Sequence, residues 1–119
     1  MVDVKKLLIS TLESFEYPIY IQGSMSDKDE YPDSFFTYWN NSTTDESFYD
    51  NNESRIVWDF DLNFYSNDPV LVNGIPLQVK QMLKAAGFIP QGSGYDIVSD
   101  EKTHTGRGMN ILFIQKVRY

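Results

Sequence analysis

Eleven consecutive residues, from Arg55 to Tyr65, alternate strictly between large apolar side chains and other side chains. The large apolar residues occupy every second position of this stretch: Ile56, Trp58, Phe60, Leu62 and Phe64. A period of two places this set on one face of a β-strand. We therefore predict a half-buried antiparallel strand, which needs neighbouring strands and a covering layer to remove its apolar face from water.

The beginning of the chain predicts an amphipathic helix. Asp3 is a suitable N-cap, because its carboxylate can accept a hydrogen bond from a backbone N–H of the first turn. Apolar residues then recur at helical spacing: Val4, Leu7, Leu8, Leu12 and Phe15. Pro18 ends the helix, because proline has no N–H and restricts the backbone of Tyr17 before it.

A second amphipathic helix is predicted after the alternating strand. Asp68 and Pro69 are typical of a helix start, and Gly87 is typical of a helix end. Gly74 and Pro76 weaken the first half of this helix, so we expect a kink or a break there. The helix residues expected to bury the apolar face of the strand are Leu8, Leu12, Val79 and Leu83.

The remaining pattern predicts an α+β fold. Further strands are expected at 19–22, 34–41, 95–98 and 109–117, with a turn at 90–94 and a loop at 99–108. The order is then helix, three strands, helix, two strands, which indicates an antiparallel sheet of about four to five strands covered by two helices. With 119 residues, the chain is expected to form a single domain, 1–119.

One of these strands is aromatic on both faces. Phe35 and Trp39 belong to one face, and Phe36 and Tyr38 belong to the other. A strand of this kind is either buried on both sides or has one face against another molecule. The polar residues 41–54 that follow suit an extended hairpin arm or a mobile loop.

Acidic residues are concentrated in one stretch of the chain. Residues 27–61 contain ten acidic and two basic residues, a net charge of −8, in a chain whose net charge is −7. This excess argues against a protein that grips the phosphates of nucleic acid. It indicates either a solvated acidic face or a surface that repels polyanions or meets a basic partner.

The sequence shows no membrane or export signal. Its apolar runs are only a few residues long, and its first residues include an early acid and no apolar segment of the secretory kind. We therefore expect a soluble, intracellular chain with no membrane partner.

No set of residues in the sequence predicts catalysis. Asp59 and Asp61 share one face of their strand and could bind Mg²⁺, but no third acid or lysine is placed to converge on them. We interpret them as the polar outer face of the strand. His104 is the only histidine and there is no cysteine, which leaves a zinc site without its usual ligands. We expect no catalytic residue, no cofactor and no metal.

Aromatic residues exceed what the predicted core requires. Tyr20, Tyr38, Tyr65 and Tyr119 lie on sides that the core pattern does not use. Tyrosine and tryptophan combine a large buried area with a polar tip, which is favoured at protein interfaces. The excess therefore favours a subunit that assembles. The residues of the candidate assembly surface are Tyr20, Tyr38, Trp39, Tyr65, His104 and Arg107.

Three segments of the chain carry a family resemblance: residues 35–41 (FFTYWNN), 58–69 (WDFDLNFYSNDP) and 99–108 (SDEKTHTGRG). They resemble small structural proteins encoded in the head–tail modules of prophages and tailed phages of Gram-positive bacteria. The order of elements is similar to that of the tail-terminator (tail-completion, head–tail joining) proteins, α+β subunits that form rings. The resemblance covers residues 17–116.

The resemblance implies a function at the end of a phage tail. The subunit would form a ring with copies of itself, commonly a hexamer in related proteins, cap the growing tail tube and dock to the head connector. It would reside in the virion, and in the host cytoplasm during assembly, with DNA passing without specific binding. The acids that we expect to face the ring lumen or the basic residues of a neighbour are Asp45, Glu46 and Asp50.

Two other functions remain open at the level of the sequence. One is an acidic binding protein that mimics DNA and inhibits a basic partner, which the charge of residues 27–61 favours. The other is a small metal-dependent nuclease that uses Asp59 and Asp61.

Overall fold

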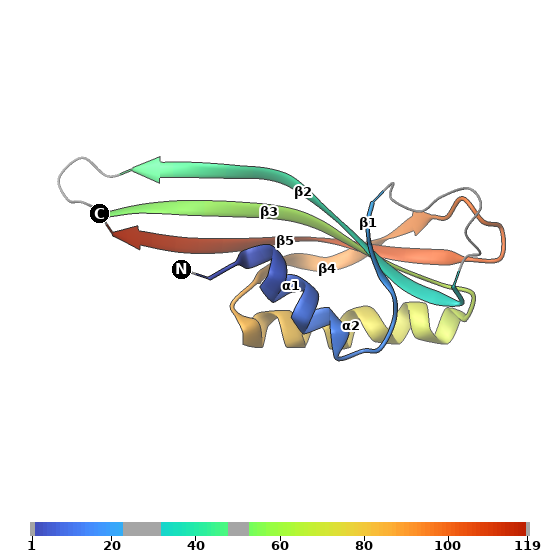
Figure 1. The fold of residues 1–119 in the computed structure, drawn as a ribbon. Coiled ribbons are helices and arrows are strands. Elements are labelled where there is room, and N and C mark those ends of the chain that lie inside the picture. Colours follow the sequence, from blue (N-terminus) through green and yellow to red (C-terminus); the bar gives the residue numbers. More distant parts are fainter. Residues whose placement is uncertain (1, 23–31, 48–52, 119) are drawn as a thin grey trace.

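In the computed structural model, which describes residues 2–22, 32–47 and 53–118, the chain forms two helices and one five-stranded sheet (Figure 1). The elements in chain order are α1 (Val4–Glu13), β1 (Ile19–Ile21), β2 (Ser34–Ser47), β3 (Glu53–Ser66), α2 (Pro69–Ala86), β4 (Ile89–Val98) and β5 (Thr105–Arg118). This order confirms the predicted α+β class.

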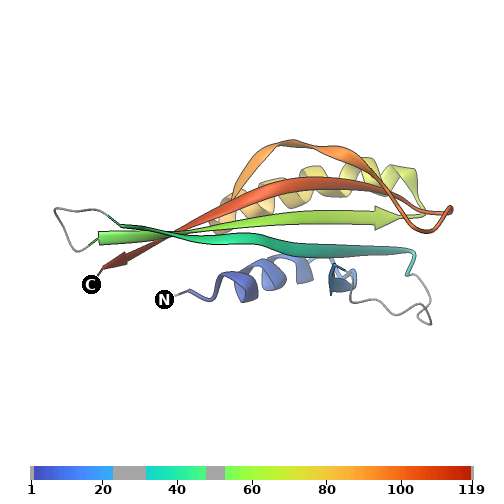
Figure 2. The same ribbon diagram turned by 90° about the horizontal axis from the view of Figure 1, so that it is seen from above.

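The sheet has the strand order β1-β2-β3-β5-β4. The β2–β3, β3–β5 and β5–β4 pairs are antiparallel, but β1 pairs with β2 in the parallel direction, so the expectation of an antiparallel sheet is wrong at this edge. Both helices cover the same face of the sheet, with α1 toward β2 and α2 toward β4 (Figures 1 and 2). We call the opposite face, which neither helix covers, the open face.

The hydrophobic core lies between β3 and the two helices. Phe60 and Phe64 of β3 are buried there, as the alternating pattern predicts. The predicted helix residues are all buried in the same cluster: Leu8, Leu12, Val79 and Leu83. Trp58 is half-buried at one end of the core, where its ring stacks on that of Phe60 with the ring planes 6° apart.

The predicted caps set the helix ends. Asp3 Oδ1 accepts a hydrogen bond from Lys6 N at 3.1 Å at the start of α1, and Asp68 Oδ1 accepts one from Val70 N at 3.0 Å at the start of α2. Gly87 ends α2 with a φ of +104°, a conformation that favours glycine.

Of the kink or break predicted in α2, the break does not occur. The helix runs without interruption through Gly74 and Pro76. Pro76 removes the hydrogen bond that a residue at this position would donate to the Val72 carbonyl. Its ring is buried in the apolar stripe of the helix with Ile75 and Val79, and this packing offsets the lost bond.

The turn predicted at 90–94 is part of strand β4. The pairing of β4 with β5 shifts register between Gln91 and Tyr95, where Gly92 and Gly94 adopt φ values of +84° and +95°. The glycines therefore form an irregularity inside a strand rather than a turn between strands.

The loop predicted at 99–108 is also too long, because β5 begins at Thr105. Strands β2, β3 and β5 are each 14 residues long. Of the two alternatives for 41–54, the described residues form a strand hairpin.

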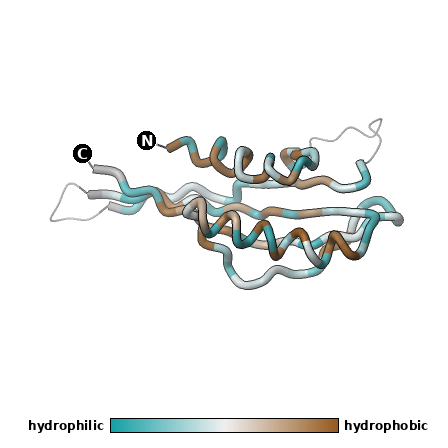
Figure 3. The backbone as a smooth tube through the Cα atoms, turned by 90° about the horizontal axis from the view of Figure 1, so that it is seen from below, coloured by the Kyte–Doolittle hydropathy of each residue, from teal (hydrophilic) through white to brown (hydrophobic). Residues whose placement is uncertain are grey.

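Beyond the residues paired with β1 and β4, these three strands continue as a three-stranded extension that we call the arm, consisting of residues 40–47, 53–59 and 113–118. The free end of the arm extends past the helices (Figure 1). The molecule is accordingly elongated, with principal dimensions of 55 × 28 × 22 Å. Seen from the helix side, hydrophobic residues gather along the helices, and the strands become hydrophilic toward the free end of the arm (Figure 3).

Candidate assembly surface

Phe35 joins three of the predicted surface residues into one aromatic cluster on the open face. Its ring lies 5.2 Å from that of Tyr65, 5.9 Å from that of Tyr20 and 6.1 Å from that of His104, measured between ring centroids. Phe35 is only 2% exposed. At Phe35 and Phe36 the two-faced aromatic pattern of β2 therefore reflects burial on both sides of the sheet, on one side by the helices and on the other by this cluster.

Two glycines of β5 give the aromatic rings of the open face their positions. A Cβ on Gly106 would lie 2.7 Å from Cδ1 of Tyr65 and 2.7 Å from Cγ1 of Ile97. A Cβ on Gly108 would lie 2.8 Å from Cε2 of Tyr95. The larger side chains of β3 and β4 therefore lie across the bare backbone of β5, and no other residue type fits there without displacing them.

His104 is a structural residue of this cluster. Its Nε2 donates to the Pro32 carbonyl at 2.8 Å, and its Nδ1 accepts from the Thr103 hydroxyl at 2.9 Å. The direction of the first bond follows from the carbonyl oxygen, which can only accept. The side chain is buried and connects the loop before β5 to the start of β2, a role other than the exposed surface position expected of it.

The structure separates the other predicted surface residues. Trp39 lies on the open face opposite Asp61 and is 49% exposed, as an interface residue would be. Tyr38 points to the helix side and is buried in the core, so its assignment to the surface is wrong. Residue 119 lies outside the described residues.

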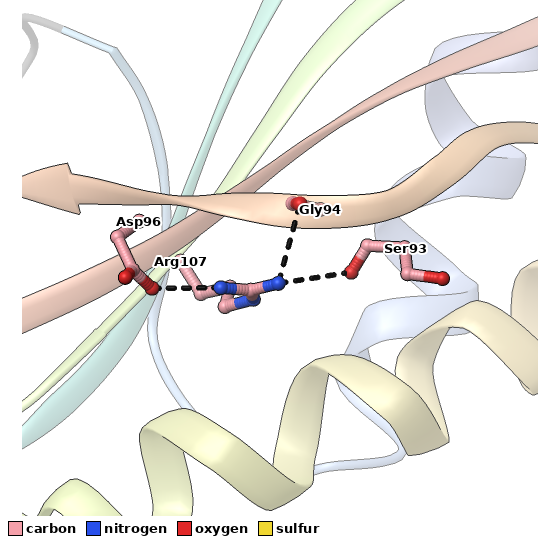
Figure 4. A network of polar contacts seen from close by, with 4 residues as sticks. All are labelled: Ser93, Gly94, Asp96 and Arg107. Carbon is pink, nitrogen blue, oxygen red and sulfur yellow. Dashed lines mark hydrogen bonds and ion pairs between the residues drawn. The ribbon is translucent and has the colours of Figure 1, made fainter.

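Arg107 also lies away from the open face. It stands opposite Phe64 in the β3–β5 register, on the helix side of the sheet. Its guanidinium donates to Asp96 at 2.7 Å and to the Gly94 and Ser93 carbonyls at 3.2 and 3.5 Å (Figure 4). Arg107 thus fastens the irregular part of β4 to β5, and we correct its assignment to the assembly surface.

The two aspartates of β3 share a hydrogen-bonding partner on the open face. Asn110 Nδ2 lies 2.6 Å from Asp59 Oδ1 and 3.3 Å from Asp61 Oδ1, and 3.1 Å from the Phe60 carbonyl. Both carboxylates face the same way, as the spacing predicts, and an amide bridges them across β3 and β5. Among residues 2–22, 32–47 and 53–118, no group of three or more metal-ligating side chains is close enough to hold an ion.

Tyr95 lies beside this pair on the outer strand β4. Partial burial of its phenol, and then the negative charge of Asp61, raise the pKa of Tyr95 above the ordinary value of 10.0. The hydroxyl therefore stays neutral over a wider alkaline range than in a free tyrosine.

The arm exposes two strand edges. β1 pairs with β2 only as far as Tyr38, and β4 pairs with β5 only as far as Leu112. Within the described part of the chain, the outer edges of residues 40–47 and 113–118 thus have no strand partner. Unpaired edges of this kind are templates for pairing with another chain. Sequence patterns did not indicate them, because an edge is defined by the pairing of distant strands.

The acids expected in a ring lumen divide between the two faces of the arm. Asp45 stands opposite Ile56 on the helix side, whereas Glu46 stands opposite Arg55 on the open side and forms an ion pair with it. Only one of these two acids can therefore face any given lumen. Asp50 lies outside the described residues.

No model of a known protein family matches this chain, and no curated protein matches its sequence. Neither described helix is both long enough and apolar enough to cross a membrane.

Proposed function

We propose that this chain is a virion structural protein, a tail-terminator or head–tail joining subunit that assembles with copies of itself into a ring. The observation that carries the proposal is the arm, which extends past the helices and leaves one strand edge uncovered on each side among the described residues. A subunit with two different free edges can bind a copy on each side, which generates a closed ring when the rotation between copies closes.

The open face supports the same function. Trp39 is exposed on this face, and Tyr95 is nearly half-exposed there. Exposed aromatic residues are enriched at protein interfaces, and here they lie on a sheet whose other face is covered by the helices. In the proposed ring these residues would contact the neighbouring components, the tail-tube protein and the head connector.

The location in a phage particle rests on the sequence resemblance of residues 35–41, 58–69 and 99–108. The net charge of −7 is in keeping with a subunit that DNA passes without binding, because carboxylates repel phosphates. In this proposal the chain has no catalytic role, and Asp59 and Asp61 act with Asn110 in holding β3 against β5.

Cryo-electron microscopy of the phage particle that encodes the chain tests this function. We expect a ring of α+β subunits between the tail tube and the head connector, into which the five-stranded sheet and its arm fit. Complete particles with no such subunit at the junction would contradict the proposal. Particles lacking the gene should accumulate as separate heads and tails.

A further inference from the structure

One row of charged residues crosses the arm from edge to edge. In the strand register, Glu46 of β2 stands opposite Arg55 of β3, and Arg55 stands opposite Lys116 of β5. All three residues are on the open side of the sheet, because directly opposed residues share a face. Glu46 and Arg55 form an ion pair. The row therefore has an acid at one free edge and a base at the other.

The two free edges of the arm also differ in charge, the β2 edge being acidic and the β5 edge basic. Residues 40–47 of β2 contain Asp45 and Glu46 and no basic residue. Residues 113–118 of β5 contain Lys116 and Arg118 and no acidic residue. Within the chain, Lys116 has the like charge of Arg55 as its cross-strand neighbour, which is unfavourable. An acid supplied from outside the β5 edge would offset this repulsion.

A second copy of the chain can supply that acid, because its β2 strand, which carries Glu46, can lie beside β5 with the backbones in the same direction. β2 and β5 both run antiparallel to β3, so they are parallel to each other. When two arms lie side by side at equal height, the β5 edge of one copy meets the β2 edge of the next as a parallel strand pair. Lys116 of the first copy then stands beside Glu46 of the second.

We infer that the β5 edge at 113–118 pairs with the β2 edge at 40–47 of a neighbouring copy, forming one continuous sheet around the ring. This inference rests on the proposed self-assembly and specifies its contact. The pairing is heterologous, since each edge meets the other edge and not its own copy. Repetition around a ring gives an unbroken row in which each copy contributes Glu46, Arg55 and Lys116 in that order, so that the Lys116 of one copy stands next to the Glu46 of the following copy.

Engineered disulfides test the contact, because the chain has no cysteine of its own. Thr44 and Ile114 both stand opposite Val57, so they share its height on the open side of the arm. Within one chain they are two strand spacings apart, roughly 9.6 Å, which is beyond the reach of a disulfide. Between paired edges of two copies they are one spacing apart, roughly 4.8 Å, which is within reach.

The double variant Thr44→Cys, Ile114→Cys should form a ladder of covalent multimers on a non-reducing gel. An equal mixture of the two single variants should form covalent dimers only, because each chain then carries one thiol. The matched control is Thr43→Cys with Ile114→Cys. Thr43 stands opposite Trp58 and belongs to the helix side, so this pair should not cross-link.

Light scattering on the native chain distinguishes a failure of the edge pairing from a failure of the proposed self-assembly. A ring of native chains without cross-linking of the Thr44 and Ile114 variants would overturn the edge pairing and leave the proposed function standing. Efficient dimers of the Thr44→Cys variant alone would also overturn it, since they indicate an edge that meets its own copy. A native chain that stays monomeric, with no cross-linking, would overturn both.

Discussion

Tyr65 lies across the bare backbone of Gly106 on the open face, where a Cβ on the glycine would come within 2.7 Å of the tyrosine ring. The same ring stacks on Phe35, so the position of Gly106 fixes the centre of the aromatic cluster. Gly108 lies in the same way beneath Tyr95, which accounts for the second glycine in the first four positions of β5.

Replacing Gly106 by alanine should destabilise the fold. The added methyl must displace Tyr65 or Ile97, an overpacking that costs about 1–3 kcal/mol in the free energy of unfolding, measurable by chemical denaturation. Gly74→Ala is the control. Nothing lies within 4 Å of a Cβ at Gly74, and alanine is the better helix former, so that variant should gain about 0.5–1 kcal/mol. Equal effects of the two substitutions would contradict this account of the open face.

Phe60→Ala should cost about 3–5 kcal/mol of unfolding free energy, because Phe60 is fully buried between β3 and the helices. Val70→Ala on the exposed side of α2 is the comparison, and should change stability by less than about 0.5 kcal/mol. Denaturation curves of both variants measure the difference. A cost below about 1 kcal/mol for Phe60→Ala would mean that the apolar face of β3 does not carry the core.

Lys116→Glu should separate folding from assembly. The new carboxylate would face Arg55 across the strands, so the stability of the monomer should stay the same or rise by a few tenths of a kcal/mol. Assembly should weaken, because Glu46 of the next copy would now meet a like charge. Lys5→Glu in the exposed first turn of α1 makes the same change in net charge away from the arm and should leave assembly intact. Unchanged assembly of the Lys116→Glu variant, measured by light scattering, would speak against the charged row.

The stability of the fold should decline in alkali partly through Tyr95. Its pKa is raised above 10.0 in the folded state, so the unfolded chain ionises first as the pH rises. The contribution of the neutral phenol is complete below pH 10 and is lost as the pH passes through the folded pKa. Tyr95→Phe should therefore lose less unfolding free energy than the native chain above pH 10. If the unfolding free energies of the two proteins decline equally with pH, Tyr95 does not contribute to the alkaline loss of stability. The difference is expected to be small, because this side chain is nearly half-exposed.

The sequence predicted those parts of the fold that depend on local chemistry. The caps Asp3 and Asp68, the end of α2 at Gly87 and the buried face of β3 all follow from residues close together in the chain. The errors arise where tertiary packing outweighs a local signal. Pro76 is tolerated because its ring is buried in the helix stripe, and the glycines at 92 and 94 bend a strand instead of ending it.

The candidate surface was less predictable, because it is made by strand pairing. Tyr20, Tyr65 and His104 come from three separate parts of the chain, and all three lie against Phe35. An excess of aromatic residues indicated an assembly surface, but the face on which each residue lies depends on the strand register. Tyr38 shows the consequence, since it stands an odd number of residues from Phe35 in the same strand and therefore lies on the opposite face, in the core.

The molar mass of the native chain in solution tests the central claim most directly. Light scattering combined with size exclusion, over concentrations up to the solubility limit, should show a species whose mass is an integer multiple of 13.8 kDa and which persists as one closed size. The Lys116→Glu variant should shift this species toward the monomer. A native chain that elutes at 13.8 kDa across the whole concentration range would contradict self-assembly.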